Sequence, residues 1–371
     1  MNSGSLKAVV TGQPGSGKST ELSRIAQILE HEFFIVWLNV DSQLDIFSVN
    51  HLEVLIAAFA SMYKIAHRLG LTITKKPLEK VVETVNKVTS KKGFALDLTT
   101  PKLLDMAGIT FKFGLNWETV REINVEPEIS DLLAYIDDGI EALKDQTGYC
   151  PLWIIDGLDK VEYNMARYIF AESRLLAYPS CIILYTVPFA LFHSPHFQRI
   201  RNYFSGTASR ELPNILPDNG EVPGDTSERR SFFEQLTENR LVSARAAGFI
   251  ENQALKLMIG KCGGIIREFI YLVQYATQEA RRMKLKKIDS TLALRAIERM
   301  KREKMRGLTQ ERVNLLCKLY HDRPKVLPGD STSEKILFEL LQNLYILYYE
   351  NGESWYWTHP ILNDFFEQEC S

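Results

Sequence analysis

The sequence is poor in cysteine and contains no C-x-x-C pair. Its five cysteines are odd in number and lie far apart along 371 residues. This pattern argues against a zinc site or a disulfide framework and favours a reducing compartment, so we expect a cytoplasmic protein. Two of the five abut apolar segments and are expected to behave as small core side chains. The cysteines are Cys150, Cys181, Cys262, Cys317 and Cys370, and the two core candidates are Cys181 and Cys262.

Long apolar runs, a strong net charge and a targeting pattern are also missing. No apolar run approaches the roughly 20 residues that span a membrane, and Val9-Val10 leads into a glycine-rich loop rather than forming a signal peptide. The formal net charge of −2 gives no global attraction to nucleic acid or to an anionic membrane. With 45% hydrophobic and 24% charged residues, the chain has the composition of a globular protein, and its length allows two or three domains. We therefore expect no membrane partner.

The glycine-rich loop is the most informative feature that is present. Residues 12–20 are Gly-Gln-Pro-Gly-Ser-Gly-Lys-Ser-Thr, which matches the P-loop pattern G-x-x-x-x-G-K-[ST]. The glycines let backbone N–H groups surround phosphate oxygens at the start of a helix, whose dipole favours negative charge. Lys18 is expected to reach the β- and γ-phosphates, and Ser19 to ligate Mg²⁺. The predicted nucleotide-binding residues of this loop are Gly12, Pro14, Gly15, Ser16, Gly17, Lys18, Ser19 and Thr20.

A carboxylate at the end of a neighbouring buried strand would complete such a site. Asp156 ends the apolar segment 151–156, the place where ligands gather in a parallel sheet, and is the expected second Mg²⁺ ligand. The alternative is that Asp156 caps the following helix. Asp159 is expected to orient or deprotonate the attacking water, so Lys18, Asp156 and Asp159 form the predicted catalytic set. The guanine-binding pattern N-K-x-D is absent after the later strands, which favours ATP.

Apolar segments alternate with helical patterns in the first half, which predicts an α/β fold with a P-loop NTPase parallel sheet. We expect strands at 7–11, 33–40, 151–156 and 181–187, none beyond 195, and the second of them buried on both faces. Helices are expected at 50–69, from 77 onward and at 127–144. Residues 90–125 are interpreted as an insertion, with a short exposed strand at 109–113.

The second half is predicted to be helical, with a self-contained block at its end. Helices are expected at 231–247, 252–259, 265–283 and 290–306. The final block has two helical segments followed by aromatic runs on either side of Asn351-Gly352, a strong hairpin pattern, and this order predicts a winged helix. The predicted domains are a P-loop NTPase core at 1–195 with the insertion at about 90–125, a helical lid at 196–306 and a winged-helix domain at 307–371.

Three further segments resemble motifs of the STAND class of P-loop NTPases, relatives of the AAA+ ATPases. Ile-Ile-Asp-Gly-Leu-Asp-Lys at 154–160 resembles their extended Walker B motif, and Cys-Gly-Gly-Ile-Ile-Arg-Glu at 262–268 is similar to the G-G-x-x-R-[DE] motif of their lid. Residues 357–365 resemble the M-H-D-type segment, although Pro360 replaces its acid. The resemblance implies a γ-phosphate contact for Arg267, a sensor-1 role for Thr186 and a contact of His359 with the β-phosphate of ADP. The alternatives are a surface ion pair for Arg267 and a structural role for His359.

The resemblance implies an ATP-binding and slowly hydrolysing switch. ADP would hold the lid and the winged helix closed, and ATP would open them for self-association and for assembly with an effector. STAND proteins usually carry effector and sensor segments that this sequence lacks, so either the sequence is a trimmed piece of a longer protein or the effector and sensor are separate proteins. Relatives of this layout in bacteria often serve in antiviral defence.

The alternative function is an AAA+ ATPase that loads on or remodels DNA. Residues 281–306 carry eleven basic and three acidic side chains, which would suit phosphate contacts, although such a run also suits a solvated helix face. Acidic residues in the predicted winged helix disfavour nucleic acid as its partner, because they would repel the phosphate backbone.

Overall fold

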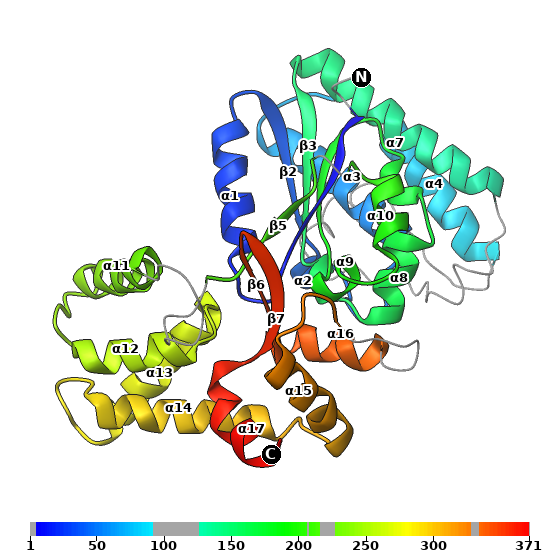
Figure 1. Cartoon of the computed structure of the whole chain (residues 1–371). Coiled ribbons are helices and arrows are strands. Elements are labelled where there is room, and N and C mark those ends of the chain that lie inside the picture. Colours follow the sequence, from blue (N-terminus) through cyan, green and yellow to red (C-terminus); the bar gives the residue numbers. More distant parts are fainter. Residues whose placement is uncertain (1–4, 92–125, 206–207, 216–226, 328–333, 371) are drawn as a thin grey trace. The chain divides into compact units, whose positions relative to one another are not determined.

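The computed structural model describes residues 5–91, 126–205, 208–215, 227–327 and 334–370 (Figure 1). The chain divides into two compact units, one made of Met1–Thr11 and Lys18–Glu211 and the other of Gly12–Gly17 and Leu212–Ser371. The predicted insertion and its strand fall on 92–125, outside the described residues. In the described part of the chain, no helix has both the length and the apolar character needed to cross a membrane.

A five-stranded sheet forms the centre of the first unit, in the order β2-β3-β4-β1-β5. The four predicted strands are all present, and β2 with β3, β3 with β4 and β4 with β1 pair in parallel. The predicted parallel α/β core is therefore confirmed. The strands are β1 (Lys7–Gly12), β2 (Phe33–Asn39), β3 (Cys150–Asp156), β4 (Ile182–Thr186) and β5 (Arg210–Leu212).

Two sequence-based expectations about the strands are wrong. Burial alternates along β2, where Val36 and Leu38 are fully buried while Ile35 and Trp37 stay partly exposed, because β2 lies at the end of the sheet order. A strand also exists beyond residue 195, since β5 continues the sheet next to β1. Its three residues, Arg-Glu-Leu, contain no apolar run, so its pairing comes from the neighbouring strand rather than from a local pattern.

Helices cover both faces of this sheet. The helix α1 (Lys18–Leu29) packs its apolar side on β2, β3 and β4, around Leu22, Leu152 and Ile154. On the other face lie α3 (His51–Arg68) and α7 (Glu126–Thr147), which contact β2 and β3 respectively (Figure 1). The remaining elements of the unit are α2 (Val40–Gln43), α4 (Lys76–Lys91), η2 (Leu158–Lys160), α8 (Tyr163–Ala171), η3 (Leu175–Ala177), α9 (Phe189–Phe192) and α10 (Phe197–Tyr203).

The second unit is mainly helical and ends in a hairpin. Two helices precede two antiparallel strands, so the predicted helix–helix–hairpin order is confirmed, while the name winged helix stays a prediction. Ile265, Leu347, Tyr349 and Trp357 share one buried cluster, which joins the hairpin to the start of α13. The elements are α11 (Ser227–Ser243), α12 (Asn252–Lys261), α13 (Ile266–Arg282), α14 (Ser290–Met305), α15 (Gln310–Asp322), α16 (Glu334–Gln342), β6 (Ile346–Asn351), β7 (Glu353–Thr358), η4 (Pro360–Leu362) and α17 (Asn363–Glu369).

The first unit ends at residue 211 and the second continues from residue 212, while the predicted domain boundaries at 195 and 306 stay predictions.

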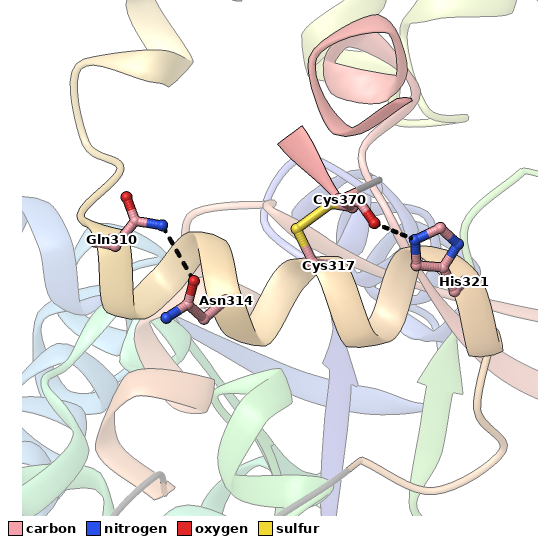
Figure 2. The surroundings of a disulfide bond; sticks show 5 residues. All are labelled: Gln310, Asn314, Cys317, His321 and Cys370. Carbon is pink, nitrogen blue, oxygen red and sulfur yellow. Dashed lines mark hydrogen bonds between the residues drawn. A yellow bond between two sulfur atoms is a disulfide. The ribbon is translucent and has the colours of Figure 1, made fainter. Parts of the chain in front are cut away.

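A disulfide joins Cys317 on α15 to Cys370 after α17, which corrects the expectation of unpaired thiols (Figure 2). Their separation of 53 residues carries no local sequence pattern, so only the fold brings these two side chains together. Cys181 and Cys262 are buried, as expected from their apolar surroundings.

Candidate nucleotide-binding site

The predicted site residues belong to both compact units: Lys18–Thr20, Asp156, Asp159 and Thr186 to the first, and residues 12–17, Arg267 and His359 to the second. In the first unit, Lys18 is the first residue of α1 and is buried. Its Nζ lies 2.9 Å from Oδ2 of Asp159, whose side chain is 11% exposed. Asp159 belongs to η2, the short turn that follows β3. The structure therefore brings the P-loop lysine and the predicted catalytic acid into one buried ion pair.

Asp156 and Thr186 lie at the carboxyl ends of neighbouring strands. Both are buried, Asp156 as the last residue of β3 and Thr186 as the last residue of β4. Thr186 Oγ1 accepts a hydrogen bond from the Gly157 N–H at 3.0 Å and donates to Ile155 O at 3.5 Å. Thr186 therefore holds the turn that carries Asp156, and its predicted sensor role stays a prediction.

Gly157 allows this turn to form. Its φ of 98° lies in the left-handed region, and a Cβ there would approach the Asp41 backbone nitrogen to 3.1 Å. Asp41 also accepts from Lys160, the last residue of η2, with Nζ 2.5 Å from Oδ2. These contacts fix the path of the chain between Asp156 and Asp159.

The donor set in this unit fits magnesium rather than a softer metal. Ser19 and Asp156 offer a hydroxyl and a carboxylate, the oxygen ligands that Mg²⁺ prefers together with water and phosphate. Ser19 and Thr20 are exposed in the first turn of α1. Within the described ranges, no group of three or more His, Cys, Asp and Glu side chains is placed to hold a metal by itself. Mg²⁺ bound together with a nucleotide commonly takes phosphate oxygens and water as its other ligands.

Residues 12–17 of the P-loop belong to the second unit. Gly15 and Gly17 have φ values of 87° and 108°, which favour glycine. The Ser16 N–H donates to Gln13 O at 3.1 Å, and Ser16 Oγ is buried without a hydrogen-bond partner among the described residues. Pro14 is half-buried. Left-handed glycines and an unpaired buried hydroxyl are features that suit a phosphate cradle.

Arg267 lies against Gly15. The Arg267 N–H donates to Gly15 O at 3.3 Å. A Cβ on Gly15 would come within 2.5 Å of the Arg267 Cβ, so glycine is required there. The Arg267 residue is exposed. Two motifs that lie far apart in the sequence thus meet, while a phosphate contact of the guanidinium stays a prediction.

His359 is fully buried in the second unit. Its Nδ1 accepts from the Ile361 N–H at 3.2 Å, and its Nε2 has no hydrogen-bond partner among the described residues. Burial, with smaller contributions from Lys304 and Lys261, lowers the pKa of His359 well below its ordinary value. A Cβ on Gly263 would approach Nε2 to 3.1 Å, which places the imidazole beside the turn before Arg267. Since Nδ1 accepts, the neutral ring carries its proton on Nε2.

Gln13 is the functional candidate that sequence reasoning missed. It occupies a variable position of the P-loop pattern, so no motif distinguishes it. The structure gives it four side-chain hydrogen bonds within the second unit.

No protein-family model matches the chain, and a search of curated proteins finds no match. Among solved structures, Cdc6p from Pyrobaculum aerophilum is 11% identical over 100% of this chain and 89% of its own, with a TM-score of 0.40. The ORC2 protein of Aeropyrum pernix, in ADPNP–ADP complexes, is 12% identical over 99% and 89%, with a TM-score of 0.41. The RuvB Holliday junction branch migration motor of Thermotoga maritima is 12% identical over 97% and 87%, with a TM-score of 0.39. We therefore assign the fold class from the strand order and parallel pairing of the sheet, and not from these likenesses.

Proposed function

We propose that this protein binds Mg²⁺·ATP at its P-loop and hydrolyses the γ-phosphate. The observation that carries the proposal is the buried pair of Lys18 and Asp159, beside a second carboxylate, Asp156, at the carboxyl end of β3. Residues 12–17 and Lys18 are consecutive in the P-loop pattern, and for this reason we propose one phosphate ligand for both. A lysine at the start of a helix, together with a carboxylate at the end of a buried strand and a second one in the turn that follows it, suits the phosphoryl transfer of P-loop NTPases.

Each residue has a distinct chemical task in this proposal. The N–H groups of residues 12–17 and the Ser16 hydroxyl bind phosphate oxygens, and the Lys18 ammonium stabilises the negative charge on the β- and γ-phosphates. Ser19 and Asp156 would hold Mg²⁺, which supplies charge neutralisation when bound. Asp159 accepts the proton of the attacking water once its ion pair with Lys18 is exchanged for a pair between Lys18 and phosphate.

The test is nucleotide binding by Lys18→Ala, measured by calorimetry with ATP and ADP. Binding should be lost, because the charge that faces the phosphates disappears. Arg24→Ala on the same helix is the matched control, since Arg24 is exposed and pairs with Glu21 one turn away. Near-wild-type affinity in Lys18→Ala would overturn the proposal.

At the finer level, we propose a slow ATP-dependent switch of the STAND type, in which His359 donates from Nε2 to the β-phosphate of ADP. The support is a buried donor that has no partner in the described part of the chain and lies beside Gly263, in the motif that also contains Arg267. In this view the ATP-bound form self-associates and meets a separate effector or sensor protein. A role in antiviral defence would follow from the resemblance.

A second candidate function, an AAA+ ATPase that acts on DNA, is favoured by the turn between α13 and α14. Residues 281–287, Arg-Arg-Met-Lys-Leu-Lys-Lys, are all exposed and contain five cations and no acid. Such a turn can contact phosphates, and binding would weaken steeply as salt rises. Absence of binding to single- or double-stranded DNA at low salt, with ATP present, would exclude this candidate.

A further inference from the structure

Gln13 is buried and makes contacts that phosphate binding does not require. Only 1% of the Gln13 residue is exposed to solvent. Nε2 donates to Ile346 O at 2.7 Å and to Leu341 O at 3.3 Å. Oε1 accepts from the Tyr348 N–H at 2.9 Å and also from the Asn214 side-chain amide. Both donor positions and both acceptor positions of this amide are therefore used.

These bonds close the open edge of the hairpin. Ile346 and Tyr348 are two residues apart on β6, so their backbone groups point to the same side of the strand. Asn214 Nδ2 donates to Tyr348 O at 3.0 Å on that side. The Gln13 amide thus occupies the position that a further strand would take, and it also satisfies a carbonyl in the last turn of α16.

The geometry ties the P-loop backbone to the hairpin. Gln13 lies between Gly12 and Pro14, in the segment whose N–H groups are expected to surround phosphate. A shift of this segment by an ångström would stretch the bonds to β6 beyond hydrogen-bond distance. Because these groups are buried, unpaired donors and acceptors would remain, so loop and strand move together or lose their contact.

We propose that Gln13 is a positioning residue through which the P-loop and the hairpin β6–β7 respond to each other. This inference rests on the proposed nucleotide binding. A nucleotide that orders residues 12–17 also orders Tyr348, and, because coupling is reciprocal, the state of the hairpin alters nucleotide affinity by the same factor. A partner that binds the hairpin would therefore change how tightly the nucleotide is held.

The experiment is amide hydrogen exchange of the full chain with ADP, with a non-hydrolysable ATP analogue and without nucleotide. The Tyr348 amide is the direct reporter, because it donates to Gln13. In the wild type, nucleotide should slow its exchange by about fivefold or more, the usual lower range of coupling. Gln13→Met keeps the side-chain length and removes the amide. Its Tyr348 amide should exchange faster and should no longer respond to nucleotide at concentrations that saturate the variant.

Two further variants make the test specific. Gln13→Glu keeps an acceptor for the Tyr348 N–H but loses both donors, so an intermediate response is expected. Tyr345→Phe removes the 2.6 Å bond from its hydroxyl to Lys304 O, which does not involve the P-loop, and should keep the wild-type response. Together these variants show whether the loss of any one hydrogen bond near the hairpin is enough to abolish the response of the Tyr348 amide to nucleotide.

The possible outcomes separate this inference from the proposed function. If the wild type binds no nucleotide, the proposed function fails, while Gln13→Met should still speed exchange at Tyr348. If the wild type binds nucleotide but exchange at Tyr348 is unchanged, the coupling is wrong. The coupling is also wrong if, in folded Gln13→Met, the Tyr348 amide responds to nucleotide as it does in the wild type. Should Gln13→Met not fold, the wild-type measurement and Gln13→Glu decide.

Discussion

Lys18 and Asp159 neutralise each other in the first unit, with 2.9 Å between Nζ and Oδ2 and little solvent around either side chain. A phosphate that binds Lys18 must compete with this carboxylate. We expect Asp159→Asn to bind ATP more tightly, by up to about tenfold if the competing pair contributes about 1.4 kcal/mol. The same variant should hydrolyse ATP about 10²- to 10⁴-fold more slowly, because the general base is lost.

The measurement pairs ATP affinity with single-turnover hydrolysis. Asp156→Asn is the companion variant, and it should weaken binding mainly when Mg²⁺ is present, since Asp156 is the proposed ligand. Opposite changes in affinity and rate are what distinguish Asp159 from a residue that only binds. If Asp159→Asn turns over at the wild-type rate, another group is the base, and Glu162 at the start of α8 is the next candidate.

His359 gives a prediction about ADP release. Its low pKa makes it a neutral donor, and a hydrogen bond from Nε2 to a charged phosphate would contribute about 1.5–3 kcal/mol. We expect His359→Asn to release ADP about 10- to 150-fold faster. Asparagine keeps an acceptor for the Ile361 N–H, as a helix cap does, so the local turn is preserved.

Oligomer size is the second readout for this variant. In the proposed switch, loss of the contact favours the open form that self-associates, so larger species should appear at equal protein concentration. Because burial lowers the pKa of His359 below its ordinary value of about 6.5, the ring stays neutral between pH 7 and pH 8 and its contribution should be constant there. Unchanged ADP release together with unchanged size would leave His359 with a structural role only.

The P-loop and its neighbouring strands were predictable because their chemistry is local. Residues 12–20 carry their pattern in consecutive positions, and the apolar segment before Asp156 identifies a buried strand by itself. The left-handed glycines of the loop follow from the same pattern. The resemblance implied a γ-phosphate contact for Arg267, which stays a prediction, whereas the backbone contact of Arg267 with Gly15 was not predicted.

The missed features depend on tertiary pairing. The strand β5 has three residues and exists because β1 offers an edge. Gln13 is one of four variable positions in its motif, and its amide finds its partners only where the fold brings β6, α16 and Asn214 to it. Cys317 and Cys370 likewise have no sequence relationship until α15 and α17 come together. Local sequence patterns do not contain such contacts between distant segments.

Because His51 is buried, we expect the free energy of unfolding to decrease in acid. This histidine is the first residue of α3, buried beside the Tyr168 ring, and burial lowers its pKa to about 4. Below pH 6.5 the unfolded chain takes up a proton on this side chain that the folded chain does not. Stability should therefore drop as pH falls from about 6.5 to 4, by up to roughly 3 kcal/mol from this residue. His51→Leu should flatten this dependence in denaturant unfolding at a series of pH values, whereas an unchanged slope would contradict the assignment.

The disulfide between Cys317 and Cys370 predicts that reductant destabilises the end of the chain. In Figure 2 it joins α15 to the segment after α17, where the Cys370 carbonyl also contacts His321. Closing a loop with a separation of 53 residues restricts the unfolded chain, and the chain-entropy model assigns about 4 kcal/mol to that restriction. Thermal unfolding should therefore shift to lower temperature on reduction.

The double variant Cys317→Ser, Cys370→Ser should show the lower unfolding temperature with or without reductant. Cys150→Ser, which removes a free thiol of the first unit, should respond to reductant like the wild type. Alkylation of both Cys317 and Cys370 in the folded, unreduced protein would show that the bond is not formed.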